Sequence, residues 1–189
     1  MNIVIWGLYR TGTNWMGDVC TMNFDTDVNR DAWGLKHLFL CEMHSHERDR
    51  RLGTTIWRLL ERRDPENHLH IVMYKNEQNW IHSMTRKKTE INGVNYFNNV
   101  FGAHTEEQML RHYRTYYNQW LEFDITNKFI LPYEEMLIDP EGVIEYISNK
   151  WDIPRKPFNM PVVGTTSQSH DLNNERIQRY IDTYRGNIS

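Results

Sequence analysis

Short apolar runs alternate with segments of helical periodicity along this chain. The runs occupy residues 2–6, 35–41, 68–74 and 128–132. Runs of this length, bounded by Gly, Pro or polar residues, are typical of buried strands, and the segments between them repeat their apolar positions every three or four residues, as amphipathic helices do. Strands that alternate with helices in this way predict an α/β fold with a parallel sheet.

Helices are predicted at residues 12–23, near 51–63, from 77, after 105, after 139 and near 172–185. Thr105 and Gln108 form a capping box, which gives one helix a clear start. Asp139 and Pro140 supply an N-cap and an N1 proline for another, and Pro154 is expected to end it. Residues 152–170 are predicted as loop. Because no repeat, low-complexity tract or linker interrupts this order, we expect one domain over residues 1–189.

The composition of the chain argues against some classes of function. The chain has 189 residues, 25% of them charged, and a formal net charge of −3, which argues against non-specific nucleic-acid binding because that needs a basic surface. It contains no apolar run long enough to predict a membrane span. Cys20 and Cys41, the only cysteines, lack metal-like spacing, and no secretory leader is recognised, so we expect a cytoplasmic protein.

Residues 3–20, IVIWGLYRTGTNWMGDVC, read as a strand, a glycine-containing turn and a helix. Backbone N–H groups at such a helix start converge on an anion, and the helix dipole adds partial positive charge. Gly7 and Gly12 let the backbone approach a ligand, and Arg10 offers a planar guanidinium suited to phosphate or sulfate oxygens. Thr11, Thr13 and Asn14 add side-chain donors. The same spacing also fits an ordinary tight strand-to-helix turn.

Two absences distinguish this turn from the phosphate loop of a magnesium-dependent kinase. Gly12-Thr13-Asn14 stands where such a kinase carries Gly-Lys-Ser/Thr, and the strand at 68–74 runs into Lys75 rather than into a metal-binding aspartate. A site without metal ligands suits a transferring group of lower charge than a phosphoryl group. A sulfuryl group meets that requirement, and no metal is expected.

The turn resembles a motif of the sulfotransferases that use 3′-phosphoadenosine 5′-phosphosulfate (PAPS). Their Pro-Lys-Ser-Gly-Thr-Thr-Trp is matched by residues 9–15, YRTGTNW, with Arg replacing Lys as in many bacterial members. The resemblance implies a three-layer, P-loop-like fold with a central parallel sheet flanked by helices, as in a small bacterial or phage-type member. It also implies that Arg10 and residues 11–14 hold the 5′-phosphosulfate and that Trp15 contacts the adenine, although Trp15 also suits core packing.

A second motif of that family is an Arg-Asn-Pro sequence followed by a Ser eight residues after the Arg, and it binds the 3′-phosphate. Lys75-Asn76 follows the strand at 68–74, and Ser83 lies eight residues after Lys75. By resemblance, Lys75 and Ser83 bind the 3′-phosphate. Lys75 lacks the bidentate geometry of Arg, and Glu77 replaces Pro and places a carboxylate near an anion site. A solvated polar helix face is the alternative interpretation.

A third likeness covers residues 131–153, which are similar to the family's Tyr-Glu-Asp-Leu, two further residues, Asp-Pro-Glu and the helix that follows. It implies that Tyr133 lies near the adenine, although a tyrosine at a strand end also serves packing alone. Transfer to an acceptor requires a base near neutral pH, a task that suits histidine. The sequence GLKHLFL makes His37 the candidate base and Lys36 a cation over the sulfonate, with ordinary surface roles as the alternative.

Other histidines are assigned no catalytic role. His44 and His46, with Glu47, lack a clear third metal ligand and are expected to be solvated. His70 lies in a predicted buried strand and is expected to be a core or edge histidine with its hydrogen bonds satisfied. Taken together, the motifs predict transfer of a sulfuryl group from PAPS to a hydroxyl or amine of a small-molecule or glycan acceptor, with PAP as product. No nucleic-acid or membrane partner is expected. The alternatives are a small metabolite or nucleotide kinase and a non-catalytic nucleotide-binding module.

Overall fold

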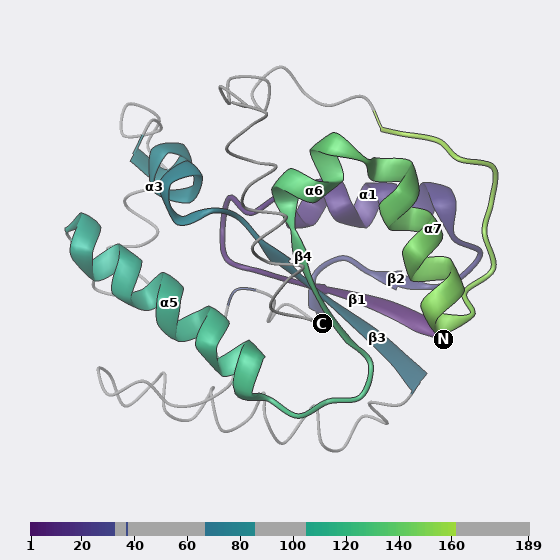
Figure 1. The fold of residues 1–189 in the computed structure, drawn as a ribbon, viewed down its shortest axis with the longest axis horizontal. Coiled ribbons are helices and arrows are strands. Elements are labelled where there is room, and N and C mark those ends of the chain that lie inside the picture. Colours follow the sequence, from purple (N-terminus) through teal and green to yellow (C-terminus); the bar gives the residue numbers. More distant parts are fainter. Residues whose placement is uncertain (33–36, 38–66, 86–104, 162–189) are drawn as a thin grey trace.

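A computed structural model describes residues 1–32, 37, 67–85 and 105–161 (Figure 1). Its described strands form one parallel sheet in the order β2-β1-β3-β4. The bounds of the strands are β1 Asn2–Trp6, β2 Val28–Asn29, β3 His68–Tyr74 and β4 Lys128–Pro132. The predicted α/β fold with a parallel sheet is confirmed.

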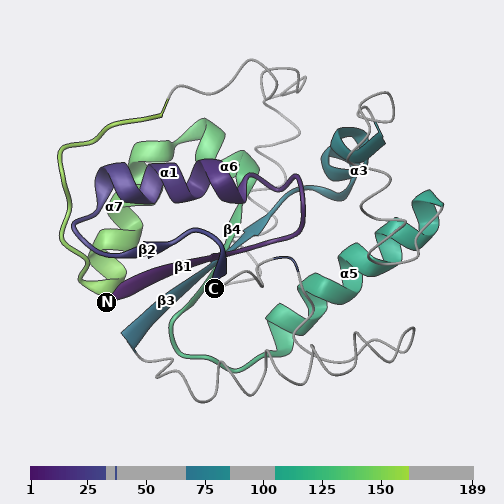
Figure 2. The same cartoon turned by 180° about the vertical axis from the view of Figure 1, so that it is seen from behind.

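Helices flank both faces of the sheet and give the fold three layers (Figures 1 and 2). One face carries α1 (Thr13–Asn23), α6 (Tyr133–Ile138) and α7 (Pro140–Trp151). The other face carries α3 (Glu77–Thr85) and α5 (Glu106–Glu122). None of the helices in the described part of the chain is both long and apolar enough to cross a membrane.

The side chains of β1 point alternately to the two faces of the sheet, and each face has its own apolar core. Ile3 and Ile5 pack with the helices α1, α6 and α7, whereas Val4 and Trp6 pack with the aromatic side chains of α3 and α5. Successive side chains of a strand point to opposite faces, so a strand covered on both sides reads as an unbroken apolar run. That is why residues 2–6 show no polar alternation after Asn2.

The strands predicted at 2–6, 68–74 and 128–132 coincide with β1, β3 and β4. Both predicted helix caps are confirmed: the Thr105 hydroxyl accepts the Gln108 N–H at 3.2 Å, and an Asp139 carboxylate oxygen accepts the Gly142 N–H at 3.0 Å. The helix that begins at Pro140 ends at Trp151, before Pro154, because Asp152 takes a left-handed conformation with φ 50°.

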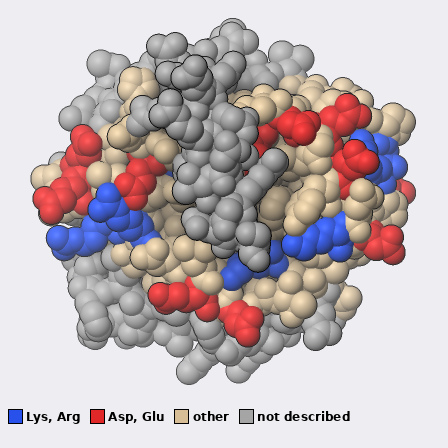
Figure 3. All heavy atoms as spheres, viewed as in Figure 1, with Lys and Arg blue, Asp and Glu red and all other residues tan. Residues whose placement is uncertain are grey.

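Two short elements, β2 and α6, were not predicted. The strand predicted at 35–41 and the helices predicted near 51–63 and 172–185 lie outside the described residues. Residues 152–161 form no helix, in agreement with the predicted loop, and Arg155 makes one isolated antiparallel bridge to Phe24. On the face shown in Figure 3, acidic and basic side chains of the described residues are interspersed.

His70 is a core histidine held in its neutral form. It is buried in β3, and its Nδ1 accepts a hydrogen bond of 2.9 Å from the Trp6 indole N–H. Protonation of Nδ1 would remove this acceptor. Burial, reinforced by the neighbouring His68, lowers the pKa of His70 from 6.5 to about 3. The folded protein therefore binds fewer protons at this position than the unfolded chain between these two pH values.

We predict that the free energy of unfolding falls as the pH is lowered from 6.5 toward 3, and that His70 contributes up to about 1.4 kcal/mol per pH unit of this loss. His70→Gln supplies an amide oxygen for Trp6 and does not titrate, so the variant should lose that part of the slope. Urea denaturation at a series of pH values measures it. The exposed His82, replaced by Gln, is the control, and equal slopes for wild type and His70→Gln would refute the assignment.

Candidate functional site

The candidate site lies at the carboxyl ends of β1 and β3, where the order of the described strands reverses. The chain passes from β1 to β2 on one side and from β3 to β4 on the other. Open α/β sheets bind ligands in the crevice at such a switch point. Trp6 pairs with Val72, and Tyr74 pairs with Pro132. This register brings the glycine loop (residues 7–14), the turn after β3 and the start of α6 to one edge of the sheet.

The glycine loop has a backbone that requires glycine at two positions. Gly12 has φ 87°, and a Cβ atom there would lie 2.6 Å from the Tyr133 ring. A Cβ atom on Gly7, at φ 148°, would lie 2.8 Å from the Met73 carbonyl oxygen. Arg10 also has a positive φ of 70°. The loop is therefore packed closely against the ends of β3 and β4 and has little freedom to take another shape.

The side chains of the glycine loop that are predicted to donate hydrogen bonds to a ligand differ in their exposure. Thr11 is fully buried, and its hydroxyl donates to the Leu8 carbonyl at 2.6 Å, so in this conformation it shapes the loop rather than facing a ligand. Thr13 is also buried, whereas Asn14 is exposed. Helix α1 begins at Thr13 with no side-chain cap and no acidic residue in its first turn. The positive end of its dipole is thus not neutralised within that turn.

Lys75 and Ser83, which the sequence predicts as partners, are in contact. The Lys75 ammonium donates to the Ser83 hydroxyl at 3.0 Å, and it lies 4.6 Å from the centre of the Tyr133 ring. Lys75 is only 4% exposed. Burial lowers the pKa of Lys75 to about 8, the charge of Glu134 opposes this shift, and the charge of Arg10 adds to it. The electrostatic effect of Arg10 indicates that both cations act in the same region.

Tyr133 links the parts of this edge. Its ring lies against Gly12 and beneath the Lys75 ammonium, and it meets the Trp15 ring edge-on with centroids 5.7 Å apart. The register explains this position. Pro132 pairs with Tyr74, so the residues that follow them, Tyr133 and Lys75, are neighbours. Four of the residues predicted to bind the cofactor are thus brought together: Trp15, Lys75, Ser83 and Tyr133.

Sequence reasoning missed Glu134. This carboxylate is 2% exposed, and its Oε1 accepts hydrogen bonds from the Asn76 N–H at 3.1 Å and from the Asn79 amide at 2.9 Å. It therefore joins the start of α6 to the turn after β3. The available signal was the likeness of Tyr133-Glu134 to the Tyr-Glu of the third motif, but that likeness does not show that the carboxylate is buried or what it contacts.

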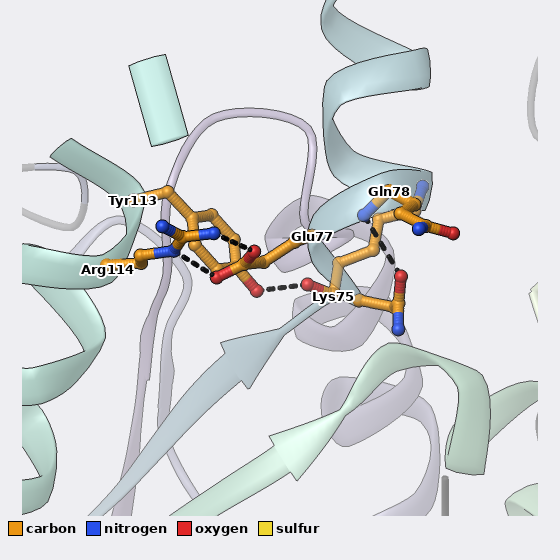
Figure 4. A network of polar contacts seen from close by, with 6 residues as sticks. Lys75, Glu77, Gln78, Tyr113 and Arg114 are labelled. Atoms are coloured by element: carbon orange, nitrogen blue, oxygen red, sulfur yellow. Dashed lines mark hydrogen bonds and ion pairs between the residues drawn. The ribbon is translucent and has the colours of Figure 1, made fainter. Parts of the chain in front are cut away.

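The carboxylate of Glu77, which stands where the resembled sulfotransferase motif has proline, is paired with a guanidinium. Arg114 of α5 donates to both Glu77 oxygens at 2.8 Å, as Figure 4 shows. Within the same network the Tyr113 hydroxyl donates to the Lys75 carbonyl, and the Asn76 side chain caps α3 by accepting the Gln78 N–H at 3.0 Å. The acidic departure from the motif is thus offset by a cation from α5.

Helix α5 also holds the glycine loop in place. The Tyr117 hydroxyl donates to the Met73 carbonyl at 2.7 Å and lies 3.5 Å from the Leu8 nitrogen, which donates to it. A further hydrogen bond links the Tyr116 hydroxyl to the Gly7 backbone. Periodicity predicts these tyrosines as packing residues. It does not reveal that their hydroxyls satisfy the backbone at the candidate site.

His37 lies against the glycine loop. Its Nδ1 is 2.6 Å from the Gly7 carbonyl oxygen, and its ring packs edge-on against Tyr9. A carbonyl oxygen only accepts, so Nδ1 carries a proton, and in the neutral ring the lone pair is then on Nε2. This is the tautomer that a base requires. Lys36, the predicted cation beside it, lies outside the described residues.

Among the residues that the structure describes, no group of three or more His, Cys, Asp or Glu side chains is arranged to hold a metal ion. His44, His46 and Glu47 lie outside that part of the chain. Comparison of the chain with protein-family models, with curated proteins and with solved structures found no match. The function is therefore inferred from the geometry and chemistry of the site itself.

We predict that Gly12→Ala lowers the free energy of unfolding by roughly 1–3 kcal/mol, because it adds a side chain at φ 87° and drives a methyl group into the Tyr133 ring. Urea denaturation measures the change. Met22→Ala, an exposed substitution on α1, is the control and should stay within about 0.5 kcal/mol of wild type. An equally small effect of Gly12→Ala would show that the loop adapts freely.

Proposed function

We propose that the protein is a sulfotransferase that moves a sulfuryl group from PAPS to a hydroxyl or amine acceptor. The main support is the meeting of two cationic elements at one edge of the sheet. Arg10 comes from the loop after β1, and the Lys75–Ser83 pair comes from the junction of β3 and α3. A donor that carries phosphate groups at both its 5′ and 3′ positions needs two such elements within one pocket.

Each part of the site has a proposed role in holding the donor. The N-terminal turn of α1 and Arg10 bind the 5′-phosphosulfate through N–H groups and a guanidinium, which suit tetrahedral anions. Lys75 and Ser83 bind the 3′-phosphate. Trp15 and Tyr133 already lie edge-on to each other, and we assign them to the adenine because aromatic faces and edges pack well against a base.

His37 is the proposed base. Its Nε2 takes the proton of the acceptor as the acceptor oxygen or nitrogen attacks sulfur, and the bond from sulfur to the bridging oxygen of the 5′-phosphate breaks. The electron pair of that bond stays with the 5′-phosphate of PAP, where Arg10 and the loop N–H groups stabilise the added charge. Catalysis then derives from positioning and from electrostatic stabilisation.

One observation favours a second candidate, a magnesium-dependent kinase. Glu134 follows a core strand and is buried at the site, and its Oε2 has no hydrogen-bond partner among the described residues. A kinase uses such a carboxylate to hold the metal of Mg-ATP. The positive charge of Lys75 acts on Glu134, and a cation near this carboxylate weakens the case for a metal ion there. Mg-ATP is therefore the natural comparison ligand.

We predict that 3′,5′-adenosine bisphosphate stabilises the protein by about 2.7 kcal/mol at a hundred times its Kd, and that Mg-ATP does so less. Lys75→Met should weaken bisphosphate binding by roughly 10- to 100-fold, because it removes a charged partner of the 3′-phosphate. Thermal denaturation and calorimetric titration measure both effects.

Lys150→Met, which removes an ammonium from the exposed end of α7, is the matched control for Lys75→Met and should bind the bisphosphate normally. Stabilisation by Mg-ATP alone would favour the kinase. Binding of neither ligand would contradict both candidates.

We predict that His37→Ala reduces turnover by about 10²- to 10⁴-fold and leaves the Kd of 3′,5′-adenosine bisphosphate unchanged, since a base acts on the acceptor. Release of PAP from PAPS, with a panel of phenols, sugars and amines as acceptors, measures turnover. The exposed His82 on α3 serves as control through His82→Ala. Full activity of His37→Ala would remove this residue from the mechanism.

A further inference from the structure

Glu134 is a buried carboxylate in a site that we assign to an anion. Only its Oε1 has hydrogen-bond donors among the described residues, namely the Asn76 N–H and the Asn79 amide. A carboxylate taken out of water is costly unless donors and an opposite charge compensate it. Two neutral donors on one oxygen leave the other oxygen uncompensated, so the arrangement requires a nearby cation.

Lys75 is that cation. Its side chain is also buried, and two of its contacts, with the Ser83 hydroxyl and the Tyr133 ring, are with groups that carry no full negative charge. The charge of Glu134 favours the protonated amine, whereas burial and the charge of Arg10 favour the neutral one. The titratable or charged groups around Lys75 come from α6 (Tyr133 and Glu134), the glycine loop (Arg10), α3 (Glu77) and α5 (Tyr113 and Arg114).

Among these groups the other carboxylate is already committed. Glu77 receives two hydrogen bonds from Arg114, so its charge is largely balanced on the side of α5. Within the described part of the chain Glu134 has no such guanidinium partner, and it also fastens the residue that follows Lys75 in the chain. One side chain therefore fixes the position of the turn and acts on the charge of the ammonium that the turn carries.

We infer that Glu134 is a positioning residue for the anion site: it fastens the turn after β3 to α6, and it is the counter-charge that keeps the buried Lys75 ammonium charged. The functional part of this inference rests on the proposed function, since only a charged ammonium attracts a 3′-phosphate strongly. Glu134 itself does not touch the phosphate. It acts through Lys75, and its own negative charge lowers the net attraction for a dianion.

Two variants separate the charge of Glu134 from its hydrogen bonds. Glu134→Gln keeps an oxygen that accepts the Asn76 N–H but removes the charge, whereas Glu134→Ala removes both. NMR of protein labelled with ¹³C at the lysine ε carbons follows the titration of the Lys75 amine, whose signal is identified by its loss in Lys75→Met. Glu135→Gln is the matched control, because it removes the same charge from the next residue of α6.

In wild type and in Glu135→Gln, the Lys75 amine should titrate near pH 8. In Glu134→Gln its midpoint should fall by roughly 1 pH unit, with little change in the thermal midpoint of unfolding. Glu134→Ala should lower both midpoints. An unchanged titration of Lys75 in Glu134→Gln would overturn the inference, because a purely structural role for Glu134 leaves that titration where it is.

Binding of 3′,5′-adenosine bisphosphate, measured by calorimetry between pH 6 and 9, tests the two proposals separately. The affinity should fall as the pH rises through the Lys75 midpoint, and in Glu134→Gln this fall should begin at lower pH. If wild type does not bind the bisphosphate while the Lys75 midpoint still moves in Glu134→Gln, the proposed function fails and the role of Glu134 stands. If the ligand binds and the midpoint does not move, only the role of Glu134 fails.

Discussion

The parallel register of β1, β3 and β4 is the constraint on which the candidate site depends. Strands of a parallel sheet all end at the same edge, and pairing of Trp6 with Val72 and of Tyr74 with Pro132 sets the ends side by side. The residues beyond the strand ends, Gly7 after β1, Lys75 after β3 and Tyr133 after β4, are therefore brought to one edge of the sheet. A shift of β4 by one residue would turn its side chains to the opposite faces of the sheet and would move the start of α6, with Tyr133 and Glu134, relative to Lys75.

Aromatic packing converts this register into a fixed geometry. The face of the sheet covered by α5 contains Trp6, Trp80 and Trp120 with the tyrosines of α5, all within one apolar core. Three of those tyrosines turn their hydroxyls toward backbone groups at the sheet edge. Each ring supplies buried apolar area, and each hydroxyl forms a hydrogen bond with a buried backbone group. The loops of the site are therefore held in shape by the aromatic core between the sheet and α5.

Much of the fold was predictable because its signals are local. Mainly apolar segments of five to seven residues marked β1, β3 and β4, and side-chain caps marked the starts of α5 and α7. Strand β2 has two residues and α6 has six, so neither shows a measurable period. Motif spacing brought Lys75 and Ser83 into one prediction. The contacts of Glu134 were not predicted, because its hydrogen bond to Asn76 joins residues that are 58 positions apart. The pairing of β3 with β4 is what brings these two residues together.

The balance of charge at this edge bears on two positions at which the chain departs from the sulfotransferase motif that it resembles. Replacing a proline by Glu77 adds a negative charge, but Arg114 binds both of its oxygens and draws that charge toward α5. Replacing an arginine by Lys75 gives up a group that stays charged when buried and introduces one that loses its proton more readily. A lysine at this position therefore needs a counter-charge that arginine would not need. Glu134 lies where such a charge is effective, so the two departures are coupled to Arg114 and Glu134, which lie far from Lys75 and Glu77 in the sequence.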